Sequence, residues 1–156
     1  MAEMEQVESG QRIVVMAVDN SENSLWAFTW YVQNFHQAGN KVLFLHSPES
    51  YINATTMSPG RVLECQREAD AKTSELKDKF IAKANADNVE AEFFVESAEK
   101  PGHAICEFAQ KHEATFIVTG TRGMGKLRRT LLGSVSDFVV HHSHVPVLVC
   151  RHTKDK

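Results

Sequence analysis

This sequence has no large excess of positive or negative charge, few cysteines and no long hydrophobic runs. Its 156 residues include 17 lysines and arginines against 20 acidic residues, which gives a formal net charge of −3. Proteins that bind nucleic acid non-specifically need a basic excess, so we expect no nucleic-acid partner. No apolar run approaches the roughly 18 residues of a membrane span, and the acidic start at residues 1–5 lacks the apolar segment of a signal peptide. We therefore expect neither membrane insertion nor secretion.

The cysteines and histidines form no recognisable bonding pattern. The three cysteines lie far apart, and their odd number favours reduced thiols in a cytoplasmic protein. Three histidines fall within residues 141–144, but His142 lies on the apolar stripe of a predicted helix while its neighbours point elsewhere. We expect no metal site built from protein ligands.

Two common phosphate-binding motifs are absent as well. No G-x-x-x-x-G-K-[ST] run follows a strand, and the first strand–helix turn, residues 19–24, contains no glycine for a dinucleotide fingerprint. That turn begins instead with Asp19. A carboxylate there would repel phosphates, but it can accept hydrogen bonds from ribose hydroxyls or help to hold a phosphate-bound Mg²⁺. Capping of the following helix is an alternative role, and the two roles are compatible.

Strand and helix patterns alternate along the chain. Four apolar runs predict strands at 12–18, 41–47, 114–119 and 145–150, and the alternation of apolar and polar residues over 89–97 predicts a half-buried strand near a sheet edge. Helical spacing predicts four helices between them: one that begins at Ser21 or Ser24 and ends at Gly39, one over 61–86, one from Pro101 and one from Ser134 to His142. This alternation predicts a single α/β domain with a five-stranded, parallel, doubly wound Rossmann-like sheet in the order 3-2-1-4-5 and helices on both faces. We place a flexible tail at 1–10, the domain at 11–151 and a second tail at 152–156.

The helical spacing also predicts which side chains face the sheet. In the first helix they are Leu25, Phe28, Val32 and Phe35. In the long second helix they are Val62, Cys65, Ala69, Thr73, Leu76, Phe80 and Ala84. Trp26 and Trp30, one turn apart, either cover the sheet or form an exposed contact patch.

The fourth strand–helix connection contains two clusters of small residues. Gly120 and Gly123 follow the apolar run 114–119, and Gly133-Ser134 comes after nine further residues. Glycines permit positive φ angles and close backbone approach, and the N–H groups at a helix start point toward an anion. Ser134 adds a hydroxyl at the predicted N-cap. The pattern predicts a phosphate site; an ordinary strand-to-helix turn would leave the second cluster unexplained.

Basic residues lie between the two clusters. Arg122 can supply a bidentate phosphate contact. Alternatively, Arg122 together with Lys126, Arg128 and Arg129 forms a solvated rim that steers anions without touching them.

Three segments together resemble the universal stress protein family. They are Ala17-Val18-Asp19-Asn20-Ser21, Leu45-His46-Ser47 and the spaced pattern G-x-x-G-x(9)-G-[ST] from Gly120 to Ser134. The resemblance spans about residues 10–151, and it is to the ATP-binding branch, because the other branch lacks these glycines. It implies ATP or AMP as the ligand, with Mg²⁺ bound through the phosphates.

The resemblance also implies roles for individual residues. Ala17, Val18 and Asp19 would line the nucleoside, and Ser47 would meet the adenine edge, where the family commonly has an aliphatic residue. The residues around the ribose and phosphates would be Thr119, Gly120, Gly123, Gly133, Ser134, Val135 and Ser136. No base stands beside an attacking water, so we assign no catalytic residue and expect no dedicated enzyme.

The function implied is that of a stress-response regulator whose nucleotide occupancy changes its protein partners. A slow ATP hydrolase and a dimeric, chaperone-like scaffold with a vestigial site are the alternatives. The last strand, Val145 to Cys150, is apolar, and Pro146, which lacks an N–H, indicates that the strand lies at a sheet edge or begins there. We expect a homodimer through this strand, related by a two-fold axis, and the resemblance implies the same.

Overall fold

The computed structural model describes residues 10–48, 56–121 and 132–152. Strands and helices alternate as the sequence predicts. The elements are β1 (Ile13–Ala17), α1 (Glu22–Asn34), β2 (Lys41–His46), α2 (Pro59–Ala86), β3 (Glu90–Val95), α3 (Pro101–Lys111), β4 (Phe116–Gly120), α4 (Ser134–His142) and β5 (Val147–Cys150). Within these ranges no helix is both long and apolar enough to cross a membrane.

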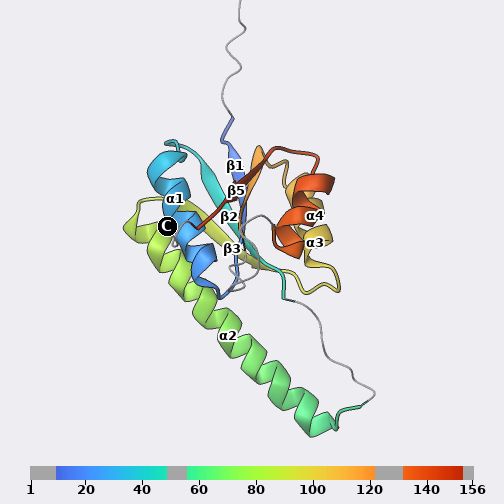
Figure 1. The fold of residues 1–156 in the computed structure, drawn as a ribbon. Helices are drawn as coiled ribbons and strands as arrows, with labels where there is room; N and C mark the ends of the chain where they lie inside the picture. Colours follow the sequence, from blue (N-terminus) through green and yellow to red (C-terminus); the bar gives the residue numbers. More distant parts are fainter. Residues whose placement is uncertain (1–9, 49–55, 122–131, 153–156) are drawn as a thin grey trace, which may run out of the picture.

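All five strands form one parallel sheet in the order β3-β2-β1-β4-β5, which confirms the predicted fold (Figure 1). In the centre, Val15 of β1 lies opposite Leu43 of β2 on one side and Ile117 of β4 on the other. The chain winds away from β1 in both directions, so the neighbours β1 and β4 mark the point where the order reverses. Ligands of doubly wound proteins bind at the carboxyl ends of such strands.

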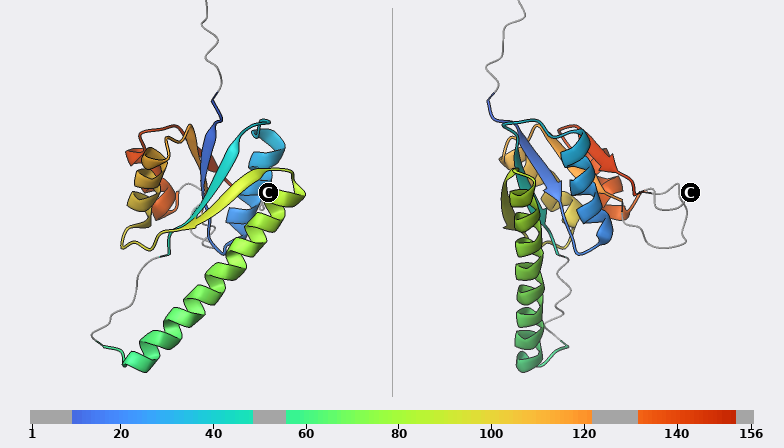
Figure 2. Two further views of the ribbon diagram at one scale, coloured as in Figure 1. Left: turned by 180° about the vertical axis from the view of Figure 1, so that it is seen from behind. Right: turned by 90° about the vertical axis from the view of Figure 1, so that its left-hand side faces the viewer.

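Helices cover both faces of the sheet (Figure 2). Successive strand residues point to opposite faces, so Val14 and Met16 pack with α1 and α2, while Val15 packs with α3 and α4. Phe28, Phe44 and Phe80 dominate the first face, and Ile105, Phe108, Ile117 and Val139 dominate the second. The double burial explains why the central strands are continuous apolar runs.

The first helix differs from the prediction in its end and in its buried face. It ends at Asn34 with Phe35 as C-cap; Gly39, with φ of 90°, belongs to the turn that follows. The buried positions are Ser24, Ala27, Phe28 and Tyr31, whereas Phe35 is 48% exposed. The Tyr31 hydroxyl can be buried because it hydrogen-bonds with His36 Nδ1 at 2.9 Å, and burial raises the pKa of Tyr31.

The second helix follows the prediction only over its last third. It runs for 28 residues and extends well beyond the sheet (Figures 1 and 2). Its buried residues are Leu76, Phe80 and Ala84 alone, so the predicted inner positions from Val62 to Thr73 do not enter the core. A helical period shows which face of a helix is apolar, but not how far the sheet beneath it reaches.

Candidate functional site

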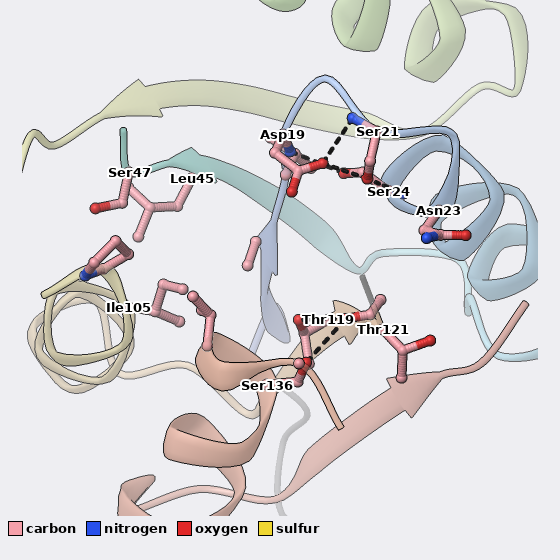
Figure 3. A pocket seen from close by; sticks show the side chains of 16 residues that line it. Asp19, Ser21, Asn23, Ser24, Leu45, Ser47, Ile105, Thr119, Thr121 and Ser136 are labelled. Atoms are coloured by element: carbon pink, nitrogen blue, oxygen red, sulfur yellow. Dashed lines mark hydrogen bonds between the residues drawn. The ribbon is translucent and has the colours of Figure 1, made fainter. Parts of the chain in front are cut away.

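A cleft opens at the carboxyl ends of β1, β2 and β4 (Figure 3). The first residues of α1, α3 and α4 complete its wall. The lining residues are Ala17, Val18, Asp19, Ser21, Asn23, Ser24, Leu45, Ser47, Pro101, Ile105, Thr119, Gly120, Thr121, Gly133, Val135 and Ser136. The cleft therefore lies at the switch point of the sheet, where the fold predicts a ligand.

Asp19 stands at the mouth of β1 inside a hydrogen-bonded turn. Its Oδ1 accepts from the backbone N–H of Ser21 at 2.8 Å and from the Ser21 hydroxyl, while its own N–H donates to Ser24 Oγ at 3.0 Å. Ser21 is the N-cap of α1, which settles where that helix begins. Asp19 thus orders the capping turn, and Figure 3 shows its other carboxylate oxygen facing the cleft. The two roles that the sequence left open for Asp19, capping of the following helix and contact with a ligand, are therefore sterically compatible.

We call Thr119, Gly120, Thr121, Gly133 and Ser136 the polar end of the cleft. Ser136 of α4 is 2% exposed, and its hydroxyl donates to the Gly120 carbonyl at 3.3 Å. The Thr119 hydroxyl donates to the same carbonyl at 3.2 Å. These bonds tie the start of α4 to the end of β4.

Gly120 is a glycine because of crowding rather than backbone angle. A Cβ at this position would lie 3.1 Å from the Asn23 carbonyl oxygen of α1, tighter than nine in ten real Cβ contacts. Its φ is not in the left-handed region. At Gly120 the close approach of the α1 backbone, and not a positive φ, requires a glycine. The close approach of an anion to these glycines stays a prediction.

The start of α4 differs from the prediction by one residue. Gly133 is the N-cap, with φ of −60° and ψ of 156°, and Ser134 is the first helical residue. Because Gly133 occupies the N-cap, the predicted N-cap position of Ser134 is wrong. Ser134 is exposed and is not among the lining residues. No side chain caps this helix. Among the described residues the N-cap makes no side-chain hydrogen bond, and the acidic residue of the first turn, Asp137, is exposed. The backbone N–H groups at the helix start therefore have no side-chain cap there.

We call Leu45, Ser47, Pro101 and Ile105 the apolar end. Figure 3 shows Leu45, Ser47 and Ile105 together, across the cleft from Thr119 and Ser136. Ile105 is 3% exposed and belongs to the core beneath the cleft. A flat, largely apolar group fits the apolar end of the cleft, and a charged group fits the polar end.

The structure brings together nine of the predicted site residues: Ala17, Val18, Asp19, Ser47, Thr119, Gly120, Gly133, Val135 and Ser136. Arg122, Gly123 and the basic segment Lys126–Arg129 lie outside the described residues. Sequence reasoning missed Pro101 and Ile105 at the apolar end, and Asn23 and Thr121 near the polar end. The available signal was topological, because each helix that follows a parallel strand starts at this edge of the sheet.

The thiol of Cys150, next to the polar end of the cleft, has low reactivity. Cys150 pairs with Gly120 across β4 and β5, and burial raises its pKa to about 11. A thiol with such a pKa stays protonated at neutral pH, so it adds no negative charge near the polar end.

The fold and the cleft define a doubly wound α/β protein with a ligand site at the switch point of its sheet. A family model described as "Universal stress protein family" matches residues 11–151, and the chain belongs to this family. The resemblance stated from the sequence is thereby confirmed.

Relatives in distant organisms share both sequence and fold. A universal stress protein of Bacillus subtilis is 28% identical over 88% of this chain and 97% of its own. A family member from Arabidopsis thaliana, solved with AMP bound, is 24% identical with a TM-score of 0.70, over 92% of this chain and 94% of that one. The Archaeoglobus fulgidus protein in complex with dAMP is 20% identical with a TM-score of 0.62, over 88% and 96%. At these identities the solved structures establish the fold.

Proposed function

We propose that this protein binds an adenine nucleotide, ATP or AMP, in the cleft and acts as a nucleotide-dependent regulator of the stress response. The observation that carries the proposal is the uncapped start of α4 at the polar end. Its first N–H groups have no acceptor within the helix, and the helix dipole adds partial positive charge. A phosphate group supplies the acceptor and the negative charge that such a helix start favours.

The rest of the cleft suits the other parts of a nucleotide. β1, which leads to Asp19, lies between β2 and β4 in the sheet. Asp19 can accept from ribose hydroxyls, while the apolar end can hold a base. No lysine or arginine is among the lining residues that the structure describes. Phosphate binding by these residues would rest on backbone N–H groups and hydroxyls, and Arg122 would add a charge-assisted contact. The AMP and dAMP complexes of the Arabidopsis and Archaeoglobus proteins support adenine as the base.

Mg²⁺ would enter with the phosphates. Across residues 10–48, 56–121 and 132–152 no group of three or more histidine, cysteine or acidic side chains could hold a metal ion. Asp19 is the one acidic side chain lining the described cleft, and a single carboxylate combined with phosphate oxygens is an ordinary Mg²⁺ environment.

Isothermal titration of the wild-type protein with ATP, AMP and adenosine tests the proposal. We expect both nucleotides to bind more tightly than adenosine, because adenosine lacks the group that reaches α4. Accumulation of ADP during incubation with ATP would favour the slow-hydrolase alternative. No binding of any of the three would favour the scaffold with a vestigial site.

We also propose that the protein acts as a homodimer through β5. This strand is an edge of the sheet, and its valines are only partly buried. The Ile117 N–H donates to the Pro146 carbonyl and the Thr121 N–H to the Cys150 carbonyl. Backbone groups alternate along a strand, so those of Val147 and Val149 point away from β4, toward a second copy.

The groove beside this edge adds an apolar surface. Trp26 and Trp30 of α1 line it together with Val149, so the contact-patch alternative for the tryptophans is geometrically available. An uncovered apolar edge favours association, and a two-fold axis would pair β5 with its own copy in antiparallel fashion.

Val149→Pro removes one backbone N–H that points away from β4. In light scattering, this variant should shift from the dimer mass of about 35 kDa, twice the 17.5 kDa of one chain, toward the monomer mass. Val149→Ala keeps the N–H and is the matched control. A wild-type monomer at micromolar concentration would refute the interface.

A further inference from the structure

A glycine at the start of α3 fits closely against a side chain of α4. A Cβ at Gly102 would lie 2.6 Å from Cδ1, 2.9 Å from Cγ and 3.0 Å from Cβ of Phe138, and real Cβ atoms essentially never approach a neighbour to less than 3.0 Å. The φ of Gly102 is not in the left-handed region, so the backbone angle does not require a glycine. Glycine also lowers the stability of a helix relative to alanine. The contact with Phe138 therefore accounts for the glycine.

Further contacts hold the Phe138 side chain in place. The ring of His142 stacks on it with centroids 3.9 Å apart, and the ring of His103 lies 4.6 Å away. His142 Nδ1 also hydrogen-bonds with the Phe138 carbonyl at 2.9 Å. Rotation about the first side-chain torsion would move the ring but would leave Cβ where it is. A methyl group added at Gly102 would therefore push the two helices apart.

Of the two helices, α4 is the one that would move. They lie side by side on one face of the sheet (Figures 1 and 2). In α4 only Ser136 and Val139 are buried. Buried residues fix α3 along most of its length: Pro101, Gly102, Ala104, Ile105, Phe108 and Ala109. Displacing α3 would expose more apolar surface than displacing α4, and would therefore cost more free energy.

Both helices contribute their first residues to the cleft. Pro101 and Ile105 of α3 lie at the apolar end, whereas Gly133 and Ser136 of α4 lie at the polar end. Phe138 follows Ser136 by two residues, which is less than one helical turn. A shift of the helix at Phe138 therefore moves the N–H groups that are proposed to bind the phosphate. Hydrogen bonds from N–H groups weaken when distance or angle leaves a narrow range.

We propose that the contact of Gly102 with Phe138 positions the start of α4 for the phosphate of the nucleotide. This inference rests on the proposed nucleotide function. Neither residue lines the cleft, so both are positioning residues that act through the helix. The contact determines how much the phosphate adds to the affinity, while the base and ribose are held by α3, β1 and β2. The ratio of AMP affinity to adenosine affinity measures this contribution.

The test uses two glycines in the same local position. Gly60 and Gly102 each follow the proline that begins a helix, Pro59 in α2 and Pro101 in α3, but a Cβ at Gly60 meets no atom within 4 Å. Gly102→Ala should weaken AMP binding about tenfold, the effect of losing one hydrogen bond to a charged group, and adenosine binding less than about twofold. Gly60→Ala, the matched control, should change neither. Adding Phe138→Ala to Gly102→Ala removes the two shortest contacts and should restore most of the AMP affinity.

The outcomes separate the two proposals. If wild type binds AMP no more tightly than adenosine, the proposed function fails and the positioning role fails with it. If wild type prefers AMP and Gly102→Ala keeps that preference, only the positioning role is overturned. Equal weakening of both ligands by Gly102→Ala, or no recovery in the double variant, would show a general packing defect and also overturn it.

Thermal melting checks that each variant is folded at the temperature of the titration. If Gly102→Ala is unfolded there, Phe138→Leu takes its place, because it alters the same contact without adding atoms to α3. It should lower the preference for AMP over adenosine by a smaller factor. An unchanged preference in folded Phe138→Leu would overturn the positioning role.

Discussion

The two ends of the cleft are built in different ways. At the polar end, backbone groups and small side chains from α1, β4 and α4 meet closely, as the 3.1 Å approach of Asn23 to the missing Cβ of Gly120 shows. At the apolar end, the surface consists of side chains such as Leu45 and Ile105 that also belong to the core. Atoms added at the polar end should therefore be costly, whereas changes at the apolar end should have graded effects.

The largest expected effect follows from adding a carboxylate at the polar end. Gly133→Asp places a negative charge at the start of α4, where the phosphate is proposed to bind. Loss of two charge-assisted hydrogen bonds, at roughly 1.5–3 kcal/mol each, corresponds to a loss of more than about 100-fold in affinity. Titration with AMP measures this, with circular dichroism to check the fold. An affinity within a factor of two of wild type would be incompatible with a phosphate at this position.

Gly120→Ala should have a smaller effect that appears first in stability. The added methyl group must push against the Asn23 carbonyl at the start of α1, and such crowding costs about 1–2 kcal/mol. Urea unfolding measures the free energy. Gly10→Ala is the matched control, because Gly10 is exposed outside the helices and strands and a Cβ there meets no atom within 4 Å. Equal stability of the two variants would show that α1 and β4 adjust to the added methyl group without strain.

The smallest effect is expected at the apolar end. Ile105→Val removes one methylene group from a residue that lies in both the core and the cleft wall. Stability should fall by about 0.5–1.5 kcal/mol. AMP and adenosine should weaken by the same factor, about two- to fivefold, because the base is common to both. A loss confined to AMP would place the phosphate, not the base, near Ile105 and would reverse the proposed orientation.

The fold could be predicted from the sequence because central strands covered on both faces are continuous apolar runs. The errors arose where tertiary contacts decide burial. In α1, Tyr31 is buried because His36 and Asn40 satisfy its hydroxyl. In α2, the apolar period continues past the sheet, so only Leu76, Phe80 and Ala84 are buried.

The cleft was predictable to the extent that it follows the strand ends and the glycine pattern. Those features locate Asp19, Gly120 and Gly133 without a structure. The apolar wall from α3 has no local motif, since Pro101 and Ile105 form an ordinary amphipathic helix start. The contact between Gly102 and Phe138 depends on how α3 packs against α4, and no local pattern in the sequence contains that information.

Backbone amide chemical shifts during titration with AMP and with adenosine test the central claim most directly. Adenosine should shift residues at the apolar end and around Asp19, and AMP should shift these and also Gly133, Val135 and Ser136 at the start of α4. The difference between the two ligands would then map the phosphate onto the helix start. Equal shifts at α4 with both ligands, or AMP-induced shifts confined to the Trp26–Trp30 groove, would contradict the account.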